Sequence, residues 1–327
     1  MKLLLAILLA PLFIFSQDYP QETFQSPLGI PLDLSGSFGE LRSNHFHSGL
    51  DFKTSGKEGL PVYAAADGYI SRIKISTFGY GKAIYITHPN GYTSVYGHLQ
   101  KANGTIQDFI KKRHYQEKAY EIEMYLYPTE LPVKKGDIIA YSGNTGGSGG
   151  PHLHFEFRDT KSEQIINPMH FGFKKVIKDE RKPIIQGVVA YPIDSTTVNN
   201  SQKPINISFS KQADGSYLSV KVKADGKVAF GINAYDFCTN GYNKNGLYKI
   251  KAYLNGVLQY QYGFDSFAFD ESRYINNFID YERFHEMGQR VQKLIQLNEY
   301  PLSVVSGNKK DGIIKVQPNT NYNYKVE

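Results

Sequence analysis

Residues 151–157 read PHLHFEF, and polar and apolar side chains alternate through this stretch. In an extended strand, successive side chains point to opposite faces, so both histidines and the glutamate share one face. The leucine and the two phenylalanines share the other face, which is expected to pack against a core. A rise of roughly 3.3 Å per residue places His152 and His154 about 6–7 Å apart on the polar face. The stretch therefore predicts a strand that presents two histidines together.

Two further motifs supply polar groups of the same kind. Residues 44–52 read NHFHSGLDF, in which His47 and Asp51 share one face of an extended chain and Gly49 between them leaves room for an ion. Residues 92–98 read YTSVYGH, with Tyr96 and His98 expected on one face. Two histidines and one aspartate form a complete protein ligand set for catalytic zinc, which keeps its fourth position for water.

The motifs HSGLD (47–51), YGHL (96–99) and SGNTGGSGGPHLHFE (142–156) resemble those of the M23 family, the LytM/lysostaphin-like zinc metallopeptidases. The similarity extends through VYAAADGYI (62–70) and VKKGDIIAYSGNTG (133–146), so it covers most of residues 38–158. The resemblance implies that the zinc ligands are His47, Asp51 and His154. It also implies that His98 and His152 are the catalytic histidines.

This resemblance makes a zinc endopeptidase the expected activity and a peptide of bacterial peptidoglycan the expected partner. We expect His152 to act as general base and His98 to stabilise the oxyanion, although the two roles can be exchanged. Tyr96 and Asn144 are predicted to contact the substrate. The glycine-rich loop 142–150 is either a turn with positive φ angles or the lining of a groove for an extended peptide.

Several alternatives remain open at this stage. His45 lies two residues from His47 on the same alternating face and competes as ligand, but only His47 has the three-residue gap to Asp51. The same ligand set also suits iron(II) oxygenases. A latent wall-binding or activator protein and an endopeptidase of glycine-rich proteins are two more possibilities. The histidines without an assigned role are His88, His114, His170 and His285.

The fold is predicted to be mainly β. From residue 29 to about 173, short β-like runs separated by Gly, Asn and Pro indicate an antiparallel sheet, with strands expected at 61–66, 69–75, 83–87, 92–96, 137–142 and 152–158. An insertion at about 100–129 is expected to hold a helix at 105–119, with Thr105 and Asp108 as a capping pair, followed by a strand at 120–127.

The sequence divides into three predicted parts: a signal peptide at 1–16, a peptidase domain at 17–173 and a C-terminal β domain at 174–327. The last is expected to be an immunoglobulin-like sandwich, with strands at 217–224 and 247–254 and a helix at 271–296. The apolar run after Lys2 predicts export to the periplasm or medium, without a stable membrane anchor after cleavage.

Composition excludes other classes of site. Cys238 is the only cysteine, so neither an intramolecular disulfide nor a cysteine-rich metal site can form. The net charge of +6 is spread along the chain, which does not favour a nucleic-acid partner. Nothing in the sequence indicates an oligomeric state.

Overall fold

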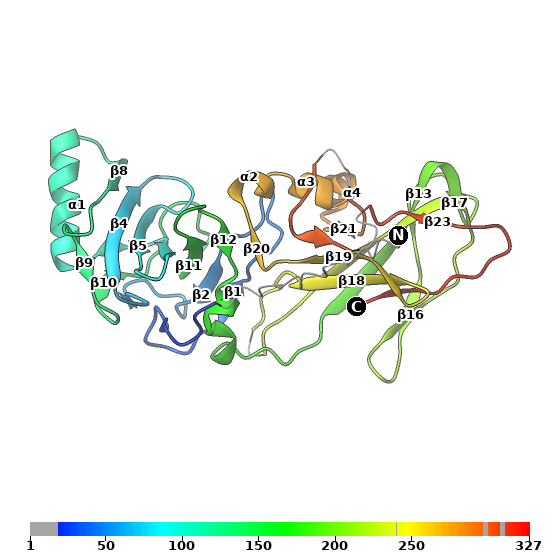
Figure 1. Ribbon diagram of the computed structural model, residues 1–327, viewed down its shortest axis with the longest axis horizontal. Coiled ribbons are helices and arrows are strands. Elements are labelled where there is room, and N and C mark those ends of the chain that lie inside the picture. The colour runs from blue at the N-terminus through cyan, green and yellow to red at the C-terminus, as the bar shows by residue number, and fades with distance from the viewer. Residues whose placement is uncertain (1–18, 240, 297–299, 308–310) are drawn as a thin grey trace, which may run out of the picture.

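The computed structural model describes residues 19–239, 241–296, 300–307 and 311–327 as two groups of antiparallel sheets that follow one another along the molecule (Figure 1). The predicted signal peptide, residues 1–16, lies outside the described residues. Within the described part of the chain, no helix has both the length and the apolar character needed to cross a membrane.

The larger sheet of the first group holds the strand predicted at 152–158. Its main path runs β1 (Leu34–Gly36), β2 (Leu50–Lys53), β11 (His152–Asp159), β6 (Tyr92–Gly97), β5 (Lys82–Thr87), β4 (Gly68–Ile75) and β8 (Ile122–Tyr125). Three short strands pair beside this path: β9 (Pro132–Val133), β12 (Ile165–Ile166) and β20 (Ser266–Phe267). A smaller sheet contains β3 (Pro61–Tyr63), β10 (Ile138–Tyr141) and β7 (Lys101–Ala102). The predicted antiparallel β architecture of this part is confirmed.

Strand β11 carries the apolar face expected from its alternation. Leu153, Phe155 and Phe157 are fully buried, and the ring of Phe155 lies 5.3 Å from that of Tyr96 and 5.0 Å from that of Phe157. β11 pairs with β2 on one side and with β6 on the other. The strand that the sequence singles out is therefore an interior strand of the sheet, fixed by a buried aromatic core.

The predicted insertion contains the expected helix and the expected strand, which follow the short strand β7. Helix α1 (Gly104–Glu117) buries Ile106 and Ile110, and β8 buries Ile122 and Met124 while it pairs with β4. The predicted capping pair is wrong, because the helix begins one residue earlier and its N-cap, Asn103, makes no side-chain capping bond. The insertion therefore extends the sheet at its β4 edge.

The second group consists of further antiparallel sheets. One contains β14 (Ile205–Asn206), β13 (Ile184–Val198), β17 (Ala224–Tyr235), β21 (Gln292–Lys293) and β23 (Ile314–Lys315). Another contains β22 (Val305–Ser306), β19 (Val257–Gly263), β18 (Lys249–Leu254) and β24 (Tyr324–Val326), and β15 (Phe209–Lys211) pairs with β16 (Tyr217–Ser219). The strand expected at 247–254 is confirmed as β18, whereas that at 217–224 ends at Ser219. C-terminal sheets are thus present.

The single helix predicted at 271–296 is wrong. The chain instead forms three short helices, α2 (Phe269–Ser272), α3 (Ile275–Phe278) and α4 (Tyr281–Met287), and then strand β21. Ile279 adopts an extended conformation, and the side chain of Asp280 accepts a bond from the backbone N–H of Arg283 to cap α4. Gly288 ends that helix in the left-handed conformation. Local capping thus overrides the helical spacing of the aromatic residues.

The two groups of sheets meet through a strand pair and an aromatic cluster. β20 pairs with β12, which connects residues 266–267 to the large sheet. Beside this pair, Phe46 packs within 5.7 Å of Phe264, Phe267 and Phe278, measured between ring centroids. Figure 1 shows α2 at this junction. The hydrophobic core is therefore continuous between the two groups.

Replacing Phe155 by Ala is expected to lower the free energy of unfolding by about 3–5 kcal/mol, because it leaves a cavity in the fully buried core. Phe78→Ala is the matched control, since that ring is 80% exposed and its removal is expected to change stability by less than about 0.5 kcal/mol. Urea denaturation measures both values. Equal losses in the two variants would contradict this placement of the core.

Candidate metal centre

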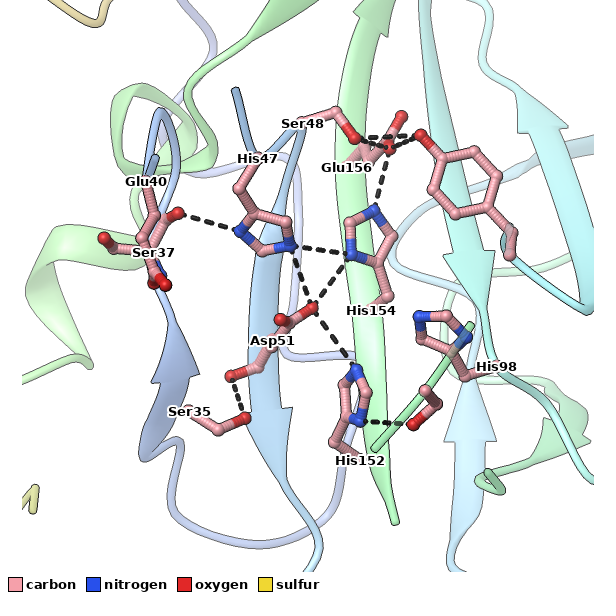
Figure 2. Close-up of polar contacts among 12 residues, drawn as sticks. Ser35, Ser37, Glu40, His47, Ser48, Asp51, His98, His152, His154 and Glu156 are labelled. Carbon is pink, nitrogen blue, oxygen red and sulfur yellow. Dashed lines mark hydrogen bonds and ion pairs between the residues drawn. The ribbon is translucent and has the colours of Figure 1, made fainter. Parts of the chain in front are cut away.

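Three buried side chains bring metal-ligating atoms together at one point of the large sheet (Figure 2). His47 Nε2 lies 3.0 Å from Asp51 Oδ1 and 3.1 Å from His154 Nδ1, and His154 Nδ1 lies 2.9 Å from Asp51 Oδ1. All three ligand atoms lie within 4.8 Å of one another. Two imidazoles and one carboxylate in this arrangement suit a divalent transition metal such as zinc.

The strand register explains this convergence. His154 on β11 lies opposite Asp51 on β2 and opposite Gly97 on β6. His47 precedes β2 and is held by two backbone bonds: its N–H donates to Glu40 O (2.9 Å) and its carbonyl accepts from Gly39 N (2.8 Å). The first ligand therefore comes from a loop, and the other two come from paired strands.

Gly49 is required here for a reason other than space for an ion. A Cβ atom at this position would lie 2.4 Å from Phe155 O and 2.9 Å from His154 Cε1. No real side chain fits that gap, so the glycine permits the close approach of β11 to the loop that carries His47. The sequence predicted the need for glycine but not the atoms that impose it.

Each of the four site histidines is fixed by a hydrogen bond at one ring nitrogen. Nδ1 donates to a backbone carbonyl in three cases: His47 to Ser37 O (2.8 Å), His98 to Thr145 O (2.7 Å) and His152 to Gly150 O (2.7 Å). His154 instead donates from Nε2 to Glu156 Oε1 (2.8 Å). Because carbonyl and carboxylate oxygens only accept, the other nitrogen of each neutral ring carries a lone pair. His47 Nε2 and His154 Nδ1 are therefore ready to ligate.

Glu156 is the outer partner of the centre, although strand alternation predicts for it only a place on the polar face. Its side chain is fully buried and accepts bonds from His154, from Ser48 Oγ (2.6 Å) and from Tyr80 Oη (2.5 Å). Arg158 donates to its other oxygen from Nε (2.8 Å) and Nη2 (2.7 Å). Tyr80 also stacks on the ring of His154 at 4.9 Å. Such outer contacts set the orientation of a ligating histidine.

The electrostatics of the centre favour positive charge at His154. Burial alone would lower the pKa of His154, but its bonds to Asp51 and Glu156 raise it to about 9. Burial would likewise raise the pKa of Asp51, yet the neighbouring histidines hold it well below its usual range. A divalent cation bound at His154 Nδ1 would replace the proton there, since metal ligands must be deprotonated.

Arg42 is a second residue that the sequence did not identify. Its Nη2 donates to Asp51 Oδ2 (2.9 Å), so one carboxylate oxygen is occupied by the guanidinium while the other faces the two histidines. This division of the two oxygens favours ligation through Oδ1 alone. Arg42 lies on the same loop as His47, five residues earlier.

His98 and His152 lie beside the three ligands. Their ring centroids are 4.7 Å apart, and His152 Nε2 is 3.5 Å from Asp51 Oδ1. His98 follows β6 directly and has a φ of +57°, a left-handed conformation that turns its ring towards His154, 5.8 Å away. Burial, followed by the charges of His154 and His152, lowers the pKa of His98 to about 4.

The predicted shared face of Tyr96 and His98 is wrong. Tyr96 lies opposite Phe155, so it points to the core, where it is fully buried and its hydroxyl accepts from Ala65 N at 2.8 Å. Its side chain therefore cannot reach a substrate in this conformation. Strict alternation failed because the left-handed residue His98 reverses the direction of its own side chain.

Asn144 lies in the loop 142–150, next to Thr145, the residue that fixes His98. Its side-chain oxygen is shielded from solvent and has no hydrogen-bond partner among the described residues. Gly146 has a φ of +74°, and a Cβ there would lie 2.3 Å from Gly81 N, so both the turn and close packing require glycine. The loop is therefore held against the chain around Gly81.

The other histidines do not join the cluster of ligand atoms found among the described residues. His45, the alternative ligand, is exposed, and its Nδ1 contacts Asn44 Oδ1 at 2.7 Å. His88 is buried and bonded to Asp67 O and Ser94 Oγ, a purely structural arrangement. His47 is therefore the histidine of the 44–52 motif that reaches the centre.

Comparison with known proteins gives matches over this part of the chain. A family model described as peptidase family M23 matches residues 45–115 and 120–168. An uncharacterized metalloprotease of Haemophilus influenzae is 35% identical over 123 residues, which are 38% of this chain and 20% of that protein. The DD-carboxypeptidase/endopeptidase Mpg of Neisseria meningitidis is 33% identical over 129 residues (39% and 23%). The peptidoglycan DD-endopeptidase ShyC of Vibrio cholerae is 32% identical over 124 residues (38% and 21%).

The chain thus spans about a fifth of the length of these curated relatives. Among solved structures, the catalytic domain of lysostaphin from Staphylococcus simulans is 27% identical, with 46% of this chain and 92% of that chain covered and a TM-score of 0.31. The matched residues include all three metal ligands and both neighbouring histidines. The part of the chain between residues 45 and 168 is therefore similar to peptidase family M23, and this part carries the metal centre.

Proposed function

We propose that this protein is a zinc metalloendopeptidase that cuts peptide cross-links of bacterial peptidoglycan outside the cytoplasm. The observation that carries the proposal is the convergence of His47, Asp51 and His154, with the rings of His98 and His152 beside them. Three protein ligands leave a position for water, as in hydrolytic zinc sites. All five residues needed for metal binding and proton transfer are present, which favours an enzyme over a latent binding protein.

The residues that would hold zinc are His47 through Nε2, Asp51 through Oδ1 and His154 through Nδ1. When bound, zinc lowers the pKa of a water towards about 7 and polarises the carbonyl group to be attacked. The two extra histidines favour hydrolysis over the oxygen chemistry of an iron(II) site, which has no need of them.

His152 is the proposed general base. Its Nδ1 proton is committed to Gly150 O, so Nε2 is free to take a proton from the attacking water and to return it to the leaving amine. His98 has the same tautomer, because its Nδ1 donates to Thr145 O. Because its pKa is lowered to about 4, the ring carries no proton at Nε2 at neutral pH, so it can donate to the oxyanion only after it takes up a proton there during the reaction. The two roles can be exchanged, since both rings face the same ligands.

The proposed substrate is supported by the relatives and by the loop 142–150. Two curated relatives carry the names DD-carboxypeptidase/endopeptidase and peptidoglycan DD-endopeptidase. Asn144 lies in this loop next to Thr145, whose carbonyl fixes His98, and stays a proposed contact to an extended peptide. A peptidase of glycine-rich proteins is the alternative that the assay below separates.

The division of the chain into a peptidase domain at 17–173 and a C-terminal domain at 174–327 also stays a proposal, as does an immunoglobulin-like arrangement of the C-terminal strands. Packing of Phe230 on Tyr324, 4.5 Å between ring centroids, joins the two larger C-terminal sheets and supports a sandwich. Export by a signal peptide at 1–16 would bring the enzyme to its substrate.

The first prediction concerns activity. Purified protein is expected to release peptide-linked fragments from peptidoglycan, and His154→Ala is expected to abolish release by removing a ligand. His98→Ala and His152→Ala are expected to keep the metal but to lower the rate about 100- to 10,000-fold, the usual contribution of a general acid or base. Mass spectrometry of the digestion products measures the rate and identifies the bond that is cut.

His45→Ala is the matched control for these variants, because it removes a neighbouring exposed histidine and is expected to retain full activity. Cleavage of pentaglycine but not of peptidoglycan would contradict the proposed peptidoglycan substrate and would identify a peptidase of glycine-rich substrates instead. Near-normal turnover by His154→Ala would refute the site.

A second prediction concerns the identity of the metal. Treatment with 1,10-phenanthroline is expected to abolish peptide release, and one equivalent of Zn²⁺ is expected to restore it, because the ligand set and hydrolysis both suit zinc. Inductively coupled plasma mass spectrometry gives the metal content. Activity that returns only with Fe²⁺, oxygen and a 2-oxo acid would instead establish the iron alternative.

A third prediction concerns Glu156. Glu156→Gln is expected to weaken zinc affinity about 10- to 100-fold, because the amide lacks the charge that orients His154 and pairs with Arg158. A competition titration with a chromophoric chelator measures the affinity. Tyr80→Phe, which removes only one of the bonds to Glu156, is the milder comparison. Unchanged affinity in Glu156→Gln would show that this carboxylate has no influence on the metal.

A further inference from the structure

The loop that delivers the first metal ligand is a small hairpin, residues 37–47, which we call the ligand hairpin. Besides the bonds at His47, it is closed by the backbone bond from Arg42 N to His45 O (3.0 Å) and by an antiparallel bridge between Leu41 and Phe46. Its His47 and Arg42 side chains both contact Asp51. One side of the hairpin is therefore part of the metal centre.

The other side of the ligand hairpin packs on the C-terminal half of the chain. Phe46, adjacent to His47, is 1% exposed and touches the aromatic rings of Phe264, Phe267 and Phe278. A Cβ on Gly39 would lie 2.3 Å from the ring of Phe264, so the backbone itself rests on that ring. Residues more than 200 positions away in the sequence thus form the surface on which the hairpin lies.

Two hydrogen bonds fix the hairpin backbone to this surface. Ser272 Oγ, in α2, accepts from Phe46 N (2.8 Å) and donates to Phe46 O (3.3 Å), so one hydroxyl satisfies both backbone groups of the residue before His47. Gly246 N donates to Ser37 Oγ (3.0 Å), and Ser37 O is the acceptor for His47 Nδ1. Ser272 therefore fixes the residue next to His47, and Gly246 fixes the residue whose carbonyl orients the His47 ring.

The same short helix also reaches the second histidine ligand. The ring of Phe269, the first residue of α2, lies 4.5 Å from the guanidinium carbon of Arg158. Arg158 is 3% exposed and donates two bonds to Glu156, which in turn accepts from His154 Nε2. The two ends of α2 therefore support different metal ligands. Ser272 bonds the backbone of the residue before His47, and Phe269 packs on Arg158, which is linked through Glu156 to His154.

We propose that α2 is a brace that positions both metal-binding histidines, and that Ser272 is a positioning residue for His47. The inference rests on the proposed metal site but is independent of which peptide bond is cut. A ligand carried on a loop needs outside support, because a small displacement of its ring weakens metal binding. The Ser272 hydroxyl supplies that support through the backbone of Phe46, a buried pair that water cannot replace.

The test compares zinc affinities of variants of the full chain by competition with a chromophoric chelator. Ser272→Ala is expected to weaken zinc binding about tenfold, near the lower end of the effect of outer-shell changes, since it acts through one further residue. Ser37→Ala, which removes the bond to Gly246 and leaves the Ser37 carbonyl in place, is expected to weaken it in the same direction. Ser272→Thr keeps the hydroxyl and is expected to restore affinity.

Thr196→Val is the matched control. Thr196 Oγ1 lies 2.7 Å from both Ile193 O and Lys227 O within the β13–β17 pair, so this variant also removes side-chain to backbone hydrogen bonding of the C-terminal half, at a half-buried position away from the ligand hairpin. Its thermal midpoint is expected to fall while its zinc affinity stays unchanged. If the role of Ser272 were purely structural, Ser272→Ala would also lower the thermal midpoint and leave the zinc affinity unchanged.

The absorption spectrum of the Co²⁺-substituted protein provides a readout besides affinity, and the proposal predicts a changed ligand-field band in Ser272→Ala and not in Thr196→Val. Zinc affinity and spectrum that match the unmodified protein in both Ser272→Ala and Ser37→Ala would overturn the brace and leave the proposed enzyme intact. If Ser272→Ala does not fold, Ser37→Ala alone decides. An unmodified protein that binds no zinc would overturn the proposed function itself.

Discussion

The pairing of β11 with β2 and β6 is the constraint on which the rest of the site depends. It sets His154 opposite Asp51 on one side and opposite Gly97 on the other. A shift of one residue would turn every side chain of β11 to the other face, exposing Phe155 and burying the histidines in the core. Because Leu153, Phe155 and Phe157 are fully buried, hydrophobic packing resists that shift. The same alternation therefore builds both the core and the metal centre.

This arrangement buries charged side chains, which costs free energy, and the hydrogen bonds around Glu156 offset that cost. Glu156 and Arg158 are almost completely buried, and removing two charges from water costs several kcal/mol per ion unless they are paired and fully bonded. Both Glu156 oxygens are bonded, one by Arg158 and the other by His154, Ser48 and Tyr80. Burial alone would raise the pKa of Glu156, but Arg158 and His154 hold it well below its usual range, so the carboxylate stays charged. This charge keeps His154 in the orientation that exposes Nδ1.

The sequence pattern predicts those parts of the site that follow from the alternation of side chains along a strand. It does not predict the parts where a single residue takes a different backbone conformation. The strand at 152–158 and the meeting of His47, Asp51 and His154 followed from spacing and from the family motifs. Tyr96 was misplaced because His98 takes a left-handed conformation, and the helix at 271–296 was misjudged because Asp280 caps a new helix. Arg42 and Tyr80 were missed because their partners lie on other strands or loops, which no periodicity reveals.

The junction between the two groups of sheets links packing to chemistry. The ligand hairpin has apolar residues on the side opposite His47, and Phe46 would be left open to water without Phe264, Phe267 and Phe278. Because Phe46 and His47 are adjacent in the chain, the packing that buries the Phe46 ring also positions His47. A change in the C-terminal aromatic cluster that moves Phe46 must also move the first metal ligand. The C-terminal half is in this sense part of the metal centre, although none of its residues supplies a ligand atom to the cluster found in the described chain.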